Sequence, residues 1–88
     1  MKNVSKYDYN FGLKAIQKAS KHFPDGSGIY TFLDSGKKVL YVGKAKNLKK
    51  RISSYLNVSN QTNRIKLLIN LTSEIKFIKT LTEIDSFI

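Results

Sequence analysis

The stretch Gly28–Leu56, GIYTFLDSGKKVLYVGKAKNLKKRISSYL, decides the fold of this chain. Its first half holds two short apolar runs, Gly28–Leu33 and Val39–Gly43, which are rich in β-branched and aromatic residues and are typical of strands. The connection Asp34–Lys37 is short, and its Gly36 is available for a positive φ. The two strands are therefore predicted to pair antiparallel as a hairpin.

A basic helix is predicted directly after the second strand. A Gly-Lys loop over residues 43–47 leads into the helix Leu48–Leu56, and Asn47 is a suitable N-cap. Arg51 borders the apolar side of this helix, whereas the two lysines before it point elsewhere. That apolar side is predicted from the spacing i, i+4, i+7, i+8 of four residues, namely Leu48, Ile52, Tyr55 and Leu56.

Further elements follow from periodicity and from local signals. Apolar residues at helical spacing predict helices over Phe11–His22 and Thr62–Leu71, and alternation predicts a third strand, Glu74–Lys79, in the same sheet. Pro24 disfavours helical geometry in the residue before it, so the first helix ends there. Thr82–Asp85 resembles a capping box that begins another helix.

These elements predict one small fold of the α/β (α+β) class, with a three-stranded antiparallel sheet flanked by helices. We expect an N-terminal extension and helix over residues 1–23 and the main domain over residues 24–88. With 88 residues and a hydrophobic content of 41%, a core is possible. The chain has no cysteine, which excludes a disulfide framework or a thiolate zinc site and fits a reducing, cytoplasmic setting. No apolar run approaches the roughly 20 residues that cross a bilayer.

The charge balance indicates the class of partner. Sixteen Lys and Arg residues stand against six Asp and Glu, which gives a formal net charge of +10 and an isoelectric point near 10.0. Such an excess attracts polyanions. The basic residues are spread over several elements instead of forming one amphipathic helix, so DNA or RNA is favoured over a membrane surface.

Side chains suited to phosphodiester chemistry cluster in the opening stretch. Tyr30 and Tyr41 lie on the two predicted strands, Gly43 and Lys44 follow directly, and Arg51 lies on the next helix. A hydroxyl can relay or accept a proton, and Lys and Arg stabilise charge that develops on a phosphate. Two plainer interpretations stay open, because strand tyrosines are commonly core residues and a basic helix face commonly holds a nucleic-acid backbone without chemistry.

The residues Gly28-Ile29-Tyr30 and Tyr41-Val42-Gly43 resemble the signature of the GIY-YIG endonuclease family. The continuation YVGKAKNLKKRISSYL is similar to the branch of that family found in the excinuclease of bacterial nucleotide excision repair. The resemblance extends from Gly28 to the end of the sequence. It implies a domain that cuts one DNA strand with Mg²⁺ or Mn²⁺ and that acts beside other excision-repair subunits.

The resemblance also implies site residues. Tyr30 and Tyr41 match the signature tyrosines, the first as general base or proton relay and the second as the group that orients water and phosphate. Lys44 and Arg51 match the basic residues at the scissile phosphate. The expected contacts to the DNA substrate come from Gly43, Lys46, Lys49, Lys50 and Tyr55.

One part of the family pattern is not matched. In the relatives a glutamate on the last helix holds the metal, and by this register its position falls just past Ile88. Glu83 and Asp85 lie in the first turn of the predicted helix and are poor substitutes, so we assign no metal ligand. Because Mg²⁺ prefers oxygen ligands in octahedral geometry, we expect weak metal binding and impaired cleavage from a chain that is cut short. The alternative is a non-catalytic basic module that binds nucleic acid.

Overall fold

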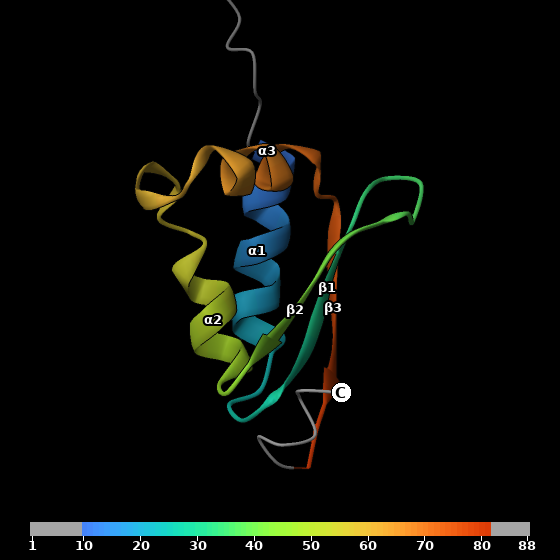
Figure 1. Cartoon of the computed structure of the whole chain (residues 1–88), viewed down its shortest axis with the longest axis vertical. Helices are drawn as coiled ribbons and strands as arrows, with labels where there is room; N and C mark the ends of the chain where they lie inside the picture. Colours follow the sequence, from blue (N-terminus) through green and yellow to red (C-terminus); the bar gives the residue numbers. More distant parts are fainter. Residues whose placement is uncertain (1–9, 82–88) are drawn as a thin grey trace, which may run out of the picture.

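The computed structural model describes residues 10–81, which form a layer of helices against one three-stranded sheet (Figure 1). The long axis of the sheet runs beside α1 and α2, and α3 lies across one end of the helical layer. The elements in chain order are α1 (Asn10–His22), β1 (Gly28–Leu33), β2 (Val39–Ala45), α2 (Leu48–Ser54), a 3₁₀ turn η1 (Val58–Asn60), α3 (Asn63–Leu71) and β3 (Glu74–Lys79). The predicted fold class is confirmed.

All neighbouring strands of the sheet are antiparallel, in the order β2-β1-β3. Tyr30 in β1 lies opposite Gly43 in β2 and Phe77 in β3, and the register to β2 shifts once, after Phe32. Because side chains alternate along a strand, Tyr30 and Phe32 share one face of β1. Both are buried, so that face is the one that packs on the helices.

The core lies between this sheet face and the helices. It combines strand residues with Ile16 and Ala19 of α1, Leu48 and Ile52 of α2, and Ile69 of α3. α1 contacts α2, α3 and β3, so the N-terminal helix belongs to the same core as the sheet. Its crossing with α3 is close, because a side chain at Gly12 would overlap the backbone carbonyl of Ile69.

The hairpin between β1 and β2 projects beyond the helical layer (Figure 1). Its tip is organised by Asp34, whose carboxylate accepts hydrogen bonds from the backbone N–H groups of Gly36 and Lys38. At this turn Lys37, not Gly36, adopts the positive φ, at 69°. The Lys37 ammonium bridges to Glu74 at the start of β3 over 2.6 Å. The tip is therefore an ordered turn with an exposed ion pair.

Three sequence predictions need correction. β2 continues to Ala45, so Lys44 belongs to a strand opposite Ile29 and not to a loop. α2 ends at Ser54 with Tyr55 as its C-cap. Leu56, placed on the buried side by its spacing, is 37% exposed because the helix ends before it.

The remaining helices and strands agree with their predictions to within one residue at each end. The lead-in before α1 and the capping box at Thr82–Asp85 lie outside the described residues. Within residues 10–81, no helix combines the length and the apolar character that a membrane crossing requires.

Candidate functional site

Two tyrosines meet in the core at the centre of the site. Tyr30 projects from β1 and is only 2% exposed, and Tyr55 caps the C-terminus of α2 and is 6% exposed. Their hydroxyl oxygens are 2.8 Å apart and share a hydrogen bond. This bond joins the sheet to the helix that carries Arg51.

Gly43 provides the space in which the Tyr30 ring lies. The two residues are opposite each other in the β1–β2 register, and a Cβ atom built at Gly43 would overlap the ring and hydroxyl of Tyr30. A side chain at this position would therefore push Tyr30 away from Tyr55. The role of Gly43 in this structure is to admit the tyrosine, and its own backbone is buried.

Tyr41 is the exposed member of the tyrosine cluster. Its ring centroid lies 6.2 Å from that of Tyr30 and 6.0 Å from that of Phe32, the second in an edge-on arrangement. It is 37% exposed, in contrast to Tyr30 and Tyr55. Of the three tyrosines, Tyr41 is thus the one that a substrate can reach directly.

Burial raises the pKa of the Tyr30 hydroxyl well above its ordinary value of 10.0, and the hydrogen bond with Tyr55 raises it further. Burial also raises the pKa of Tyr55, while the Tyr30 bond acts in the opposite direction there. The nearby Arg51 guanidinium lowers both pKa values, but less than burial raises them. At neutral pH both hydroxyls are protonated, which favours the relay role predicted for Tyr30 over the role of general base.

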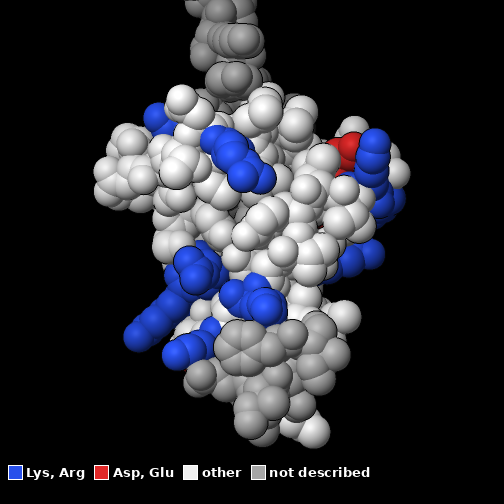
Figure 2. All heavy atoms as spheres, viewed as in Figure 1, with Lys and Arg blue, Asp and Glu red and all other residues white. Residues whose placement is uncertain are grey.

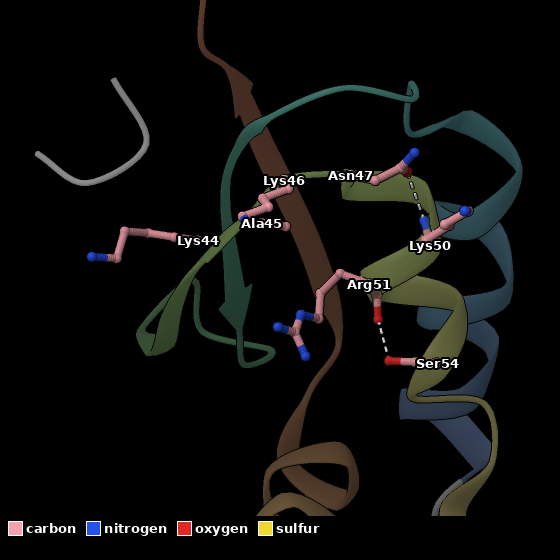
Figure 3. A pocket seen from close by; sticks show the side chains of 7 residues that line it. All are labelled: Lys44, Ala45, Lys46, Asn47, Lys50, Arg51 and Ser54. Atoms are coloured by element: carbon pink, nitrogen blue, oxygen red, sulfur yellow. Dashed lines mark hydrogen bonds between the residues drawn. The ribbon is translucent and has the colours of Figure 1, made fainter. Parts of the chain in front are cut away.

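A pocket of about 500 Å³ opens beside this cluster, between the end of β2 and α2 (Figure 3). Figure 2 shows Lys and Arg side chains gathered over this part of the molecule, and no acidic side chain is visible among them on this face. The residues that line the pocket are Lys44, Ala45, Lys46, Asn47, Lys50, Arg51 and Ser54. A basic hollow of this kind suits the negative charge of a phosphate group.

The first turn of α2 is fixed in place by hydrogen bonds. The Asn47 side chain accepts a bond from the Lys50 N–H at 3.0 Å and donates one to Asp25 at 3.2 Å. The Leu48 N–H donates to the Gly26 carbonyl. These bonds hold the helix, and with it Arg51, against the loop that precedes β1.

The basic side chains do not all converge. Arg51 projects from α2 into the space between the helix and β2, whereas the Lys44 ammonium extends away from it (Figure 3). Lys44 occupies the strand position opposite Ile29, on the sheet face away from the helices. Lys46 and Lys50 line the pocket as well, but Lys49 is exposed outside that lining.

Three lining residues, Ala45, Asn47 and Ser54, are not among the site residues predicted from the sequence. The sequence predicts Asn47 as a helix cap, and the lysines on either side of it are the signal that it borders the pocket. Ser54 donates to the Arg51 carbonyl at 2.6 Å, one turn along α2 (Figure 3). Its i+3 spacing from Arg51 was the available signal.

The described residues do not fit a Mg²⁺ or Mn²⁺ ion. Three carboxylates lie between residues 10 and 81, and each has another contact: Asp25 with Asn47, Asp34 with the hairpin turn and Glu74 with Lys37. Over that range no three His, Cys, Asp or Glu side chains gather as a metal site. Hard divalent cations such as Mg²⁺ require oxygen ligands, which carboxylates provide. Within residues 10–81, the tyrosine cluster and the basic pocket therefore combine hydroxyl and cationic groups, and no carboxylate cluster lies among them.

The sequence model of the UvrC-like GIY-YIG domain matches residues 26–88. The chain belongs to this family. UvrABC system protein C of Bartonella henselae is 47% identical over 77 residues, which are 88% of this chain and 12% of that protein. The corresponding protein of Christiangramia forsetii is 40% identical over 74 residues, again 12% of its length. The chain thus spans about an eighth of the relatives that it matches, and the resemblance to the GIY-YIG family is confirmed.

Solved structures of the UvrC-like GIY-YIG domain agree with this fold. The N-terminal endonuclease domain of UvrC from Thermotoga maritima, bound to its catalytic cation magnesium, has a TM-score of 0.72 and 33% identity. The match covers 82% of this chain and 78% of that one. A point mutant of the same domain, also bound to its catalytic cation, has a TM-score of 0.71 and 30% sequence identity to this chain. The three-stranded architecture is therefore that of an endonuclease domain of the UvrC-like GIY-YIG type.

Proposed function

We propose that this chain is a DNA endonuclease domain that binds a phosphodiester in the pocket between β2 and α2, in a system related to nucleotide excision repair. The observation that carries the proposal is the hydrogen-bonded pair of Tyr30 and Tyr55 beside a pocket lined by Arg51. The magnesium-bound relative with the same fold supports a phosphodiester as the substrate.

In this proposal each group has a separate role. Arg51, with Lys46 and Lys50, binds the phosphate and stabilises the charge that develops on it. Tyr41, which is exposed, orients the water and the phosphate, as the resemblance implies. Tyr30 relays a proton: it takes up the proton of the attacking water as it donates its own to Tyr55 across their shared hydrogen bond, and Tyr55 releases its proton to solvent, so that both hydroxyls are protonated before and after the step. Lys44 and Lys49 bind the flanking backbone from outside the pocket's centre, and Gly43 keeps Tyr30 in place.

We infer weak affinity for Mg²⁺ or Mn²⁺ and slow nicking, because the described residues include no cluster of carboxylates. The same observation favours a second function, a non-catalytic basic module that binds nucleic acid. For the endonuclease function we propose DNA as the substrate, other excision-repair subunits as partners and the cytoplasm as the location, whereas the second function requires only a nucleic acid.

A nicking assay on supercoiled DNA separates these functions when DNA binding is measured on the same samples. We expect salt-sensitive binding and slow nicking with Mg²⁺ or Mn²⁺ that is lost in Arg51→Ala and Tyr30→Phe. Salt-sensitive binding without nicking, unchanged in both variants, would support the non-catalytic module. Fast metal-dependent nicking would support the endonuclease and refute the weak metal affinity. An absence of DNA binding at low salt would refute both functions.

A further inference from the structure

A second groove lies between β2 and α3, and the phosphate site does not include it. It encloses about 520 Å³. Its lining is mostly apolar, with one aromatic ring and one cationic group, namely Leu40, Tyr41, Thr62, Arg64, Ile65, Leu67, Leu68 and Leu71. Leu67 and Leu71 are 41% and 48% exposed, so apolar surface here faces solvent in the described chain.

Tyr41 connects this groove to the phosphate site. It lines the groove, and its ring centroid lies 6.2 Å from that of Tyr30 in the tyrosine cluster. Tyr41 and Ala45 are four residues apart on β2, and Ala45 lines the basic pocket. At about 3.3 Å per strand residue, the two hollows are roughly 13 Å apart along β2. One strand of nucleic acid can therefore reach from one hollow into the other.

We propose that this groove binds the base of an unpaired nucleotide next to the phosphate held in the basic pocket, so that the domain prefers single-stranded DNA to duplex. The inference rests on the proposed function and adds the form of the substrate. The exposed Tyr41 ring provides a stacking surface, and Arg64 provides a charge for the neighbouring phosphate. In a duplex the bases are stacked and paired, and their faces cannot enter an apolar groove.

The distribution of charge favours a nucleotide over a protein as the occupant. In Figure 2 a basic side chain lies over α3 and a second basic group lies over α2 and the end of β2, with uncharged surface between them. An apolar strip between two cationic regions matches a nucleotide strand, whose bases are apolar on their faces and whose backbone is anionic. The net charge of +10 disfavours a second copy of this chain in the same place.

The test compares a labelled single strand and a duplex of equal length by fluorescence anisotropy with the full 88-residue chain. We expect the native chain to bind the single strand more tightly at the same salt concentration. Leu67→Asp should weaken single-strand binding roughly tenfold, in the range of one lost stacking contact, and affect duplex binding much less. Ile78→Asp is the matched control, since it changes the charge equally at a 69% exposed position on the other sheet face.

A second pair of variants tests stacking directly. Tyr41→Phe keeps the ring and should retain the single-strand preference, whereas Tyr41→Ala should lose it. A strand that contains 2-aminopurine should lose fluorescence when the base stacks on the native chain or on Tyr41→Phe, but not on Tyr41→Ala. Retained quenching in Tyr41→Ala would overturn the proposal.

A further control distinguishes this inference from the proposed function. Lys46→Ala removes a cation from the basic pocket and should weaken single-strand and duplex binding alike. If Lys46→Ala has this effect but Leu67→Asp and Ile78→Asp are indistinguishable, the groove proposal is wrong and the phosphate site stands. If Lys46→Ala and Arg51→Ala leave all DNA binding unchanged, the proposed phosphate site is wrong, and with it the proposed function. Self-association that depends on Leu67, with unchanged DNA binding, would assign the groove to a second copy and overturn the proposal.

Discussion

The hydroxyl of Tyr30 on β1 lies 2.8 Å from the hydroxyl of Tyr55 at the end of α2, and both are buried. Each group satisfies the other inside the core, so neither is left without a hydrogen-bond partner. Because Arg51 lies one turn before Tyr55, the bond also joins the sheet to the helix that lines the basic pocket. Stability and site geometry thus depend on the same pair.

The two hydroxyls should contribute to stability as a pair. The loss of unfolding free energy on removing both should be smaller than the sum of the losses on removing each one alone. Tyr30→Phe or Tyr55→Phe leaves the other hydroxyl buried and unpaired, which costs about 1–3 kcal/mol of unfolding free energy. The double variant removes both polar groups, and we expect its loss to be clearly smaller than the sum of the single losses. Urea denaturation of the four proteins measures this coupling. Simple additivity would contradict the shared bond.

The fold should lose stability at alkaline pH. Burial raises the pKa of Tyr30 and Tyr55 above the ordinary 10.0. Above that pH the unfolded chain releases protons that the folded chain retains, so unfolding becomes more favourable. Below it both states hold the protons, and these groups contribute no pH dependence. Thermal melts across this range, with tyrosinate absorbance recorded, check the prediction.

The control for that experiment is the double variant Tyr30→Phe with Tyr55→Phe, whose alkaline loss of stability should be smaller. Tyr41→Phe keeps both buried hydroxyls and should lose stability at alkaline pH nearly as the native chain does, because the Tyr41 hydroxyl raises the pKa of Tyr30 and Tyr55 less than burial does. Equal alkaline curves for the native chain and the double variant would show that other groups cause the effect.

Gly43→Ala should displace Tyr30. The added methyl group overlaps the ring, and overpacking of a core typically costs about 1–3 kcal/mol. We expect a lower melting temperature and a loss of nicking that exceeds the loss of DNA binding. Gly36→Ala is the control, because a Cβ atom there makes only an ordinary contact of 3.5 Å with Asp34. Native-like nicking by Gly43→Ala would refute the positioning role.

Asn47→Ala should destabilise the helix that carries Arg51. It removes the bond to the Lys50 N–H and the contact to Asp25, and loss of an N-cap costs about 1 kcal/mol. We expect reduced unfolding free energy in urea and weaker DNA binding, since Arg51 and Lys50 follow directly in α2. Asn47→Ser retains a capping oxygen and should recover most of the stability. A Ser variant as unstable as the Ala variant would show that the cap is not the cause.

The fold could largely be predicted from the sequence because its signals are local. The alternation of Gly28–Leu33, the proline after α1 and the cap Asn47 each act within a few residues, and the elements begin and end close to their expected positions. The prediction that Leu56 is buried was wrong because the apolar spacing of the sequence continues beyond Ser54, where the helix ends. The prediction that Lys44 lies in a loop was wrong because β2 continues through it. Its pairing with Ile29 is a long-range contact that the local sequence does not specify.

The site could be predicted less completely. Tyrosines in strands were expected to converge, but which of them is buried depends on which sheet face the helices cover, and that is a tertiary property. The contact between Tyr30 and Tyr55 joins residues 25 positions apart and has no local signature. The apolar groove beside Tyr41 likewise arises from the placement of α3 against β2, which no motif in either element specifies.

The hairpin tip around Asp34 projects from the body of the fold and has no residue in either hollow (Figure 1). Exposed turns of this kind tolerate insertions and chemical attachment. Since the chain contains no cysteine, a single Ser35→Cys replacement would provide a unique point for a fluorescent dye. Energy transfer from that dye to a labelled oligonucleotide would report the direction in which the strand lies along β2.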